Sequence, residues 1–322
     1  MIKELAIIIP AYKSLYLKEA LDSLAHQSNL NFNLYIGDDA SPDNLYEIVK
    51  HYEDRLTIFY KRFEHNLGGK DLVAHWERCF DMTQDEKWLW LFSDDDIASP
   101  ECVSSFYRYI NDNRSAELLH FNIEMIDNKS EHLAYCPPFP DVMTAADFFE
   151  KRIDYKLSSF VVEYIFTRDV YFREGKLQNF DLAWGADDAT WIKFAKVNGI
   201  HTINGPLVKW RYSGSNVSSL TSDISIITRK LNATISYINW ATAFFEKNNI
   251  AVNVSQTKMV RFALGSIDNA SVFKLAVRLK LVPVLLKGLG KNYSKNLKII
   301  SYSYFRVITA RAVKGIKKLL RR

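Results

Sequence analysis

Apolar runs and amphipathic segments alternate over the first hundred residues of this 322-residue chain. Four runs are short and strand-like, at residues 5–10, 32–37, 56–60 and 88–92. Between them, Leu17, Leu21 and Leu24 recur at helical spacing, and helices are also expected at residues 45–52 and 72–80. Strands that alternate with helices predict an α/β fold with a mostly parallel central sheet and helices on both faces.

Carboxylates follow two of these predicted strands. Asp38 and Asp39 come after the second run, and Asp94, Asp95 and Asp96 come after the fourth. Because parallel strands end at the same rim of a sheet, we expect the two clusters to share one cleft. Hard divalent cations relieve repulsion between carboxylates and also bind phosphate oxygens. The pattern predicts a site for Mn²⁺ or Mg²⁺ with a diphosphate, although acidic turns or helix caps would show the same residues.

Charge is distributed unevenly along the chain. The formal net charge is +5, but residues 269–322 contain no Asp or Glu and 14 Lys or Arg, which leaves −9 on the first 268 residues. From residue 273 to residue 322, apolar and basic residues recur at helical spacing. Such helices can lie on an anionic membrane surface, or they can pack on the rest of the protein. Nucleic acid is disfavoured as a partner because no reading motif is present and the body is acidic.

Cysteine usage and hydropathy indicate the compartment. Cys79, Cys102 and Cys136 are odd in number and far apart, so neither a disulfide framework nor a zinc site is expected. No signal peptide and no run of about 18 apolar residues is recognised. These features predict a cytoplasmic protein, and the basic tail predicts a peripheral position on the inner face of the cell membrane.

Five motifs occur in an order that resembles a family 2 glycosyltransferase with the GT-A nucleotide-diphospho-sugar fold. They are residues 7–12, 20–28, 37–43, 66–69 and 93–100. The resemblance covers about residues 4–218. It implies a GT-A catalytic domain at 1–220, with a donor half at about 1–100 and an acceptor half at about 101–220. A basic, amphipathic helical region would follow at 221–322.

The resemblance also implies roles for particular residues around a nucleotide-sugar donor and a divalent metal. Asp39 would accept a hydrogen bond from the nucleobase, Asp94 would contact the ribose, and Arg211 would meet the diphosphate or brace its own loop. Asp95 would bind the metal, with Asp96 as an auxiliary ligand. The full donor-binding set is Pro10, Tyr12, Asp39, Lys70, Asp94 and Arg211.

A second acidic pair, Asp187 and Asp188, follows Trp184 and Gly185. The family places an acidic pair ahead of a helix here, and its second acid removes the proton of the acceptor hydroxyl. By that resemblance Asp188 is the general base, and Trp184 and Asp187 contact the acceptor. The alternative is a capping role for the pair, at the start of a helix over 188–197.

The family resemblance, with its single proposed base, implies an inverting, metal-dependent glycosyltransferase. It would move a sugar, most simply from a UDP-sugar, to a hydroxyl of a lipid-linked or growing surface polysaccharide such as O-antigen or capsule. One alternative is a nucleotidyltransferase on a related fold, but the first predicted strand is not followed by a glycine-rich basic loop. The other is a non-catalytic scaffold protein that binds nucleotide-sugars without turnover.

Overall fold

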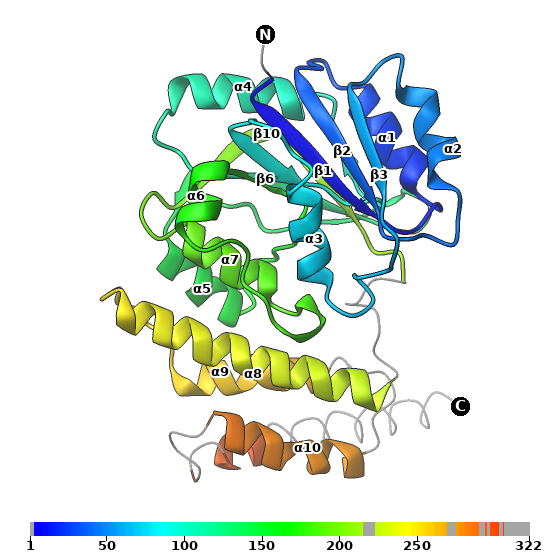
Figure 1. Cartoon of the computed structure of the whole chain (residues 1–322). Helices are drawn as coiled ribbons and strands as arrows, with labels where there is room; N and C mark the ends of the chain where they lie inside the picture. The colour runs from blue at the N-terminus through cyan, green and yellow to red at the C-terminus, as the bar shows by residue number, and fades with distance from the viewer. Residues whose placement is uncertain are drawn as a thin grey trace, which may run out of the picture. The chain divides into compact units, whose positions relative to one another are not determined.

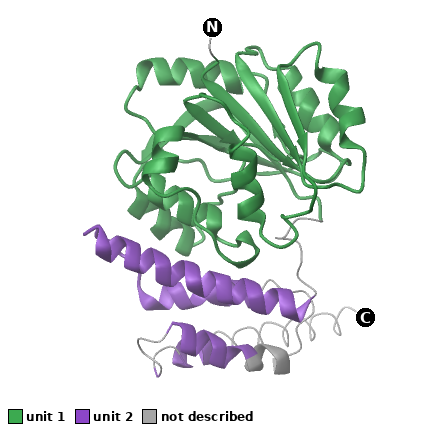
Figure 2. Cartoon of the chain, viewed as in Figure 1, with its two compact units in different colours: residues 1–220 green, residues 221–322 purple. Residues whose placement is uncertain are grey.

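The computed structural model describes residues 3–214, 223–268, 275–289, 294, 297–302 and 305. The chain divides into two compact units, residues 1–220 and residues 221–322 (Figure 2). The first unit is a mixed α/β domain, and the described part of the second unit is helical (Figure 1).

A ten-stranded sheet forms the centre of the first unit, in the order β3-β2-β1-β4-β9-β6-β10-β5, with β7 beside β6 and β8 beside β10. The strands β1 to β4 are parallel, β10 is parallel to β6, and β9 runs antiparallel between β4 and β6. The prediction of a mostly parallel central sheet is therefore confirmed. The strand bounds are β1 Leu5–Ala11, β2 Phe32–Asp38, β3 Ile58–Arg62, β4 Trp88–Leu91, β5 Ile97–Ala98, β6 Leu118–Ile126, β7 His132–Tyr135, β8 Val142–Met143, β9 Tyr164–Thr167 and β10 Ile200–Arg211.

Helices cover both faces of this sheet. Side chains of β1 alternate, and Leu5, Ile7 and Ile9 pack in one buried cluster with Leu24 of α1 and Phe106 of α4. Helix α3 lies across β1 on the other face (Figure 1). The helix bounds in this unit are α1 Leu17–Ala25, α2 Leu45–Val49, α3 Leu72–Phe80, α4 Cys102–Asp112, α5 Ala145–Ile153, α6 Arg168–Arg173 and α7 Ala186–Phe194, with short 3₁₀ turns at Lys50–Tyr52 and Asp181–Ala183.

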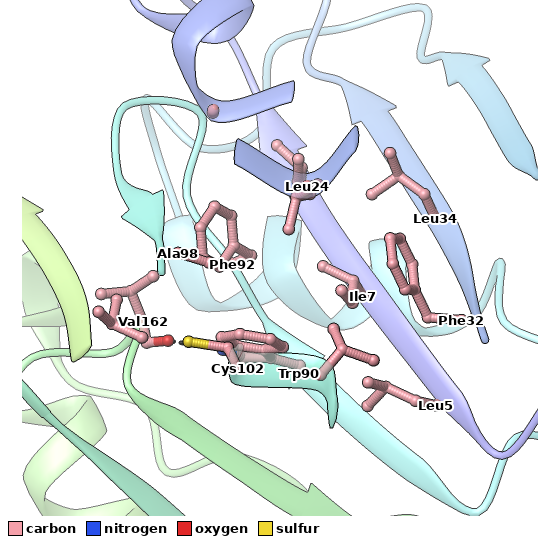
Figure 3. Packing of buried hydrophobic residues seen from close by; sticks show 14 of the residues in the cluster. Leu5, Ile7, Leu24, Phe32, Leu34, Trp90, Phe92, Ala98, Cys102 and Val162 are labelled. Atoms are coloured by element: carbon pink, nitrogen blue, oxygen red, sulfur yellow. Dashed lines mark hydrogen bonds between the residues drawn. The ribbon is translucent and has the colours of Figure 1, made fainter. Parts of the chain in front are cut away.

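Burial on both faces explains why the predicted strands read as continuous apolar runs. Every residue of β4 is buried, and the indole Nε1 of Trp90 donates a hydrogen bond to the carbonyl oxygen of Val162 at 2.6 Å (Figure 3). Trp90 therefore joins the strand that carries the acidic motif to the segment that leads into β9.

Strand β6 was not predicted, because polar side chains interrupt its apolar pattern. The sheet satisfies them individually. Asn122 Oδ1 accepts a hydrogen bond from the Phe139 amide at 3.0 Å, and Glu124 contacts His132 at 2.9 Å. Partners that lie 17 and 8 residues away along the chain make these polar positions compatible with a buried strand.

The second unit contains α8 Ile224–Lys247, α9 Gln256–Asp268 and α10 Leu275–Gly288. The hydroxyl groups of Thr234 and Ser266 lie 2.8 Å apart and join α8 to α9. A Cβ atom at Gly288 would lie 2.5 Å from Ile235, so glycine lets α10 approach α8 closely. Within the described residues, no helix is both long and apolar enough to cross a bilayer. Residues 306–322 of the basic, amphipathic segment expected at 273–322 lie outside the described residues.

Candidate active site

A pocket of about 410 Å³ lies at the carboxyl ends of β1, β2 and β4. It brings together six of the residues singled out in the sequence: Pro10, Tyr12, Asp39, Asp94, Asp95 and Asp96. The other lining residues are Lys13, Asn66, Gly68, Gly69, Leu72, His75, Trp76, Leu91, Phe92, Ser93, Val161 and Trp210. The two carboxylate clusters, separated by more than fifty residues of chain, thus meet at one rim, as parallel strands require.

Asp39 is buried and held by the loop that follows β3. Its Oδ1 accepts the amide of Leu67 at 2.7 Å, and its Oδ2 accepts the amide of Gly68 at 2.8 Å. The guanidinium of Arg78 also bonds to Oδ1. A Cβ atom at Gly68 would lie 2.8 Å from Oδ2, so this approach requires glycine. These contacts fix the direction of a carboxylate that lines the pocket.

Asp94, Asp95 and Asp96 point in different directions. Asp94 Oδ2 accepts the amides of Tyr12 and Lys13 at 2.9 and 3.0 Å, which ties the acidic loop to the end of β1. Asp96 is buried, and its Oδ1 accepts the amide of Arg211 at 2.7 Å. Asp95 is half-buried and lines the pocket. The amides of Tyr12, Lys13 and Arg211 thus anchor Asp94 and Asp96 on either side of Asp95.

Crowding of these carboxyl groups perturbs their protonation. Burial and the neighbouring Asp94 raise the pKa of Asp95 to about 7. Burial raises the pKa of Asp94, and burial together with Asp95 raises the pKa of Asp96 well above its usual range. Three carboxyl groups that are costly to ionise together define a place where an added positive charge is favourable.

The donor set fits a cation that takes part of its coordination from substrate. Among the described residues, no three carboxylate, imidazole or thiolate side chains converge as a complete metal site. Mg²⁺ and similar cations are commonly held by one or two carboxylates together with phosphate oxygens. Asp95 and Asp96 supply that number of carboxylates beside a cavity large enough for a diphosphate.

Arg211 and Lys70 differ from the other predicted donor-binding residues in their placement. Arg211 is fully buried, and its guanidinium donates to the carbonyl oxygen of Asp95 at 2.7 Å, to Ser130 Oγ at 2.8 Å and to Glu19 at 2.8 Å. This geometry corresponds to the bracing alternative, because the guanidinium bonds to the backbone of the acidic loop. Lys70 is exposed and does not belong to the described lining of the pocket; its contact with a donor stays a prediction.

The second acidic pair opens α7. Asp188 is buried, and its carboxylate is paired with Arg152 at the end of α5, with Nε to Oδ1 at 2.9 Å and Nη2 to Oδ2 at 2.8 Å. Two parallel bonds of this kind fix the orientation of a carboxylate as well as binding it. The pairing links α5 to α7, and the role of Asp188 as general base stays a prediction.

Asp187 is in a different environment, although it adjoins Asp188. It is half-buried, and no ion pair of its carboxylate occurs in the described part of the chain. Desolvation and the adjacent Asp188 raise the pKa of Asp187 to about 7. The turn before it is unusual, because Leu182, Ala183 and Gly185 all adopt positive φ (61°, 53° and 80°). This turn orients Trp184 and the first turn of α7.

Glu163 is a titratable residue that the sequence analysis did not single out. It is fully buried, Oε1 accepts the amide of Phe160 at 2.7 Å, and Oε2 has no hydrogen-bond partner among the described residues. Burial is the main cause that raises its pKa to about 8, and Asp187 adds to it. Burial and Asp95 are the larger causes of the raised pKa of Asp96, and Glu163 adds to them. Glu163 is thus electrostatically coupled to both acidic clusters, and only its apolar surroundings along the strand could have pointed to a buried acid.

Comparisons with known proteins agree with this architecture. An uncharacterized glycosyltransferase of Rickettsia typhi is 25% identical over 219 residues, which cover 64% of this chain and 63% of that protein. The poly(ribitol-phosphate) β-N-acetylglucosaminyltransferase TarS of Staphylococcus aureus is 31% identical over 118 residues, which cover 35% of this chain and 20% of that protein. The chain thus matches less than two thirds of the length of these relatives.

Solved structures show the same fold. TarS residues 1–349 in complex with UDP-GlcNAc superpose with a TM-score of 0.57 at 19% identity, over 94% of this chain and 92% of that chain. The mannosyltransferase PcManGT of Pyrobaculum calidifontis, in complex with GDP-Man and Mn²⁺, superposes with a TM-score of 0.52 at 15% identity, over 97% of this chain and 87% of that chain.

The sheet order, the acidic rim and these neighbours define an α/β domain with the GT-A glycosyltransferase fold. Residues 6–174 match the model of glycosyl transferase family 2. Because this match covers more than half of the chain, the chain belongs to that family. The family resemblance noted in the sequence is thereby confirmed.

Proposed function

We propose that this protein is an inverting glycosyltransferase that moves a sugar from a UDP-sugar to an acceptor hydroxyl, with help from a divalent cation. The observation that carries the proposal is the pocket at the ends of β1, β2 and β4, where Asp39 and Asp95 face one cavity. The family match supports transfer of a sugar from a nucleotide donor. The TarS complex with UDP-GlcNAc supports uridine as the nucleoside.

In this proposal the nucleobase lies beside Asp39 and Tyr12. The Asp39 carboxylate is already oriented by the amides of Leu67 and Gly68, so an imide N–H of the base can bond to it without reorganisation of the loop. Asp95 and Asp96 would hold Mn²⁺ or Mg²⁺ with the diphosphate. When bound, such a cation neutralises charge on the departing nucleoside diphosphate.

We assign the general base to Asp187 in place of the predicted Asp188. As the acceptor oxygen attacks the anomeric carbon, its proton passes to the Asp187 carboxylate, and the bond between the anomeric carbon and the phosphate oxygen breaks. A base with a pKa of about 7 is matched to this task near neutral pH. The ion pair between Asp188 and Arg152 keeps the start of α7 in place.

The acceptor is proposed to be a hydroxyl of a bacterial surface polymer, either lipid-linked or growing, as in O-antigen or capsule. The partial similarity to an enzyme named for poly(ribitol-phosphate) supports a polymeric acceptor. The basic, acid-free segment 269–322 supports a peripheral position on an anionic membrane at the cytoplasmic face. Trp184 is retained as a candidate acceptor contact.

Two variants that differ by one position test the base assignment. Asp187→Asn removes the proton acceptor, so transfer should fall about 100-fold or more while UDP affinity stays unchanged. Asp188→Asn keeps the acceptor but breaks a buried ion pair, so it should mainly lower stability, by about 3–5 kcal/mol. Radiolabelled transfer to membrane extract, UDP calorimetry and urea unfolding measure the three quantities.

The outcomes separate the alternatives. Full transfer by Asp187→Asn would remove the base assignment. Binding of UDP-sugars with no turnover by the wild type, in any extract, would favour a scaffold protein. Release of pyrophosphate from a nucleoside triphosphate would favour a nucleotidyltransferase.

A further inference from the structure

The charges that line the pocket are unequal. The described lining contains four aspartates, Asp39 and Asp94 to Asp96, but a single lysine or arginine, which is Lys13. The Arg78 guanidinium bonds to Asp39 and offsets that carboxylate locally. The acidic loop at Asp94 to Asp96 is therefore the part of the pocket where negative charge remains concentrated.

The backbone of Lys13 is bonded to this acidic loop. Its amide donates to Asp94 Oδ2 at 3.0 Å, so the residue is fixed against the acidic turn. Lys13 lines the same pocket as Asp94 and Asp95. The side chain is half-buried, so its charge is less screened than that of an exposed lysine.

We propose that Lys13 is a positioning residue that binds the diphosphate of the donor. This inference rests on the proposed function, which places a nucleoside diphosphate in this pocket. A diphosphate beside Asp94 and Asp95 adds two negative charges to a region that is already acidic, and a bound divalent cation balances only two of the total. The Lys13 ammonium supplies a further positive charge from the protein itself, and an ammonium binds phosphate as a mobile point charge.

The consequence is a division of labour in donor binding. The nucleoside is held at Asp39, whose carboxylate the amides of Leu67 and Gly68 orient. The diphosphate is held by the cation and by Lys13 together, so part of its affinity should persist when divalent cations are removed.

The test compares uridine, UMP and UDP by calorimetry, each with a chelator and with Mn²⁺. Lys13→Met should leave the affinity for uridine unchanged and weaken UDP about 10-fold or more in the chelator arm, because a charge-assisted bond to phosphate is lost. UMP should show a smaller loss. Lys13→Arg should restore most of the UDP affinity. Lys18→Met, at an exposed lysine paired with Asp22, is the matched control for loss of one positive charge.

Thermal unfolding of each variant verifies that it is folded, and Lys13→Gln gives a second variant if Lys13→Met is not. Equal UDP affinity of Lys13→Met and the wild type in the chelator arm would overturn the inference. So would a loss confined to the Mn²⁺ arm, which would make Lys13 an organiser of Asp94 and Asp95, or an equal loss for uridine. If the wild type binds neither uridine nor UDP in any arm, the proposed function itself fails.

Discussion

Replacement of Glu163 by glutamine should remove a loss of stability that the wild type undergoes as the pH rises. Glu163 is fully buried, and its pKa is raised from 4.5 to about 8. Between these values the unfolded chain loses the Glu163 proton while the folded protein keeps it. The unfolded state then binds fewer protons, so this group lowers the unfolding free energy as pH rises, by about 1.36 kcal/mol for each pH unit.

Glutamine has no proton to lose, and its carbonyl oxygen can still accept the Phe160 amide as Oε1 does at 2.7 Å. From about pH 5 to about pH 7 the unfolding free energy of Glu163→Gln, relative to the wild type, should therefore increase by about 3 kcal/mol. The difference at about pH 5 reports the cost of the buried amide alone. Because this cost is the same at every pH, it does not change the pH-dependent part of the difference in unfolding free energy.

Urea unfolding at several pH values, followed by tryptophan fluorescence, measures this difference. Six of the seven tryptophans lie in residues 1–220, so the signal reports the α/β unit. Glu64→Gln, at an exposed position, is the matched control and should follow the wild type at every pH. If the difference between Glu163→Gln and the wild type is the same at about pH 5 and about pH 7, Glu163 is ionised in the folded protein and the reasoning is refuted.

Three further substitutions are expected to separate structure from binding. Gly37→Ala should cost about 1–3 kcal/mol in urea unfolding, because the new Cβ would overlap Cys79 Sγ, and Cys79→Ala should restore most of that loss. Arg211→Met should cost about 3–5 kcal/mol, because it leaves the acidic loop and Glu19 without their buried guanidinium; an unchanged urea midpoint would exclude the bracing role. Asp95→Asn should abolish the Mn²⁺-dependent gain in UDP affinity measured by calorimetry and leave uridine binding intact, and a retained gain would move the cation elsewhere.

Several elements were predictable because their signal is local. The runs at 5–10, 32–37 and 88–92 are apolar because both faces of β1, β2 and β4 are covered, and such burial leaves a continuous pattern in the sequence. The meeting of Asp39 with Asp95 also followed from sequence, since parallel strands end at one rim. By contrast β6 was missed, because its polar residues find partners that only the folded chain supplies.

The choice between Asp187 and Asp188 shows where sequence reasoning stops. The two residues are adjacent and chemically identical, so spacing alone cannot rank them. The partner that distinguishes them is Arg152, which lies 36 residues earlier at the end of α5. Arg211 presents the same case: its type and position fitted either a diphosphate contact or a brace, and the bonds to Glu19 and Ser130 correspond to the brace.

The amino-acid sequence by itself determined the α/β class, the acidic rim and the membership of family 2, because periodicity, strand-end residues and motif order are properties of neighbouring residues. Only the tertiary structure decided which carboxylates are paired, which are left half-buried with raised pKa values, and that Lys13 lines the pocket. Those properties depend on desolvation and on charges brought together from distant parts of the chain. They arise from the packing of α5, α7, β9 and β10, and no local pattern encodes them.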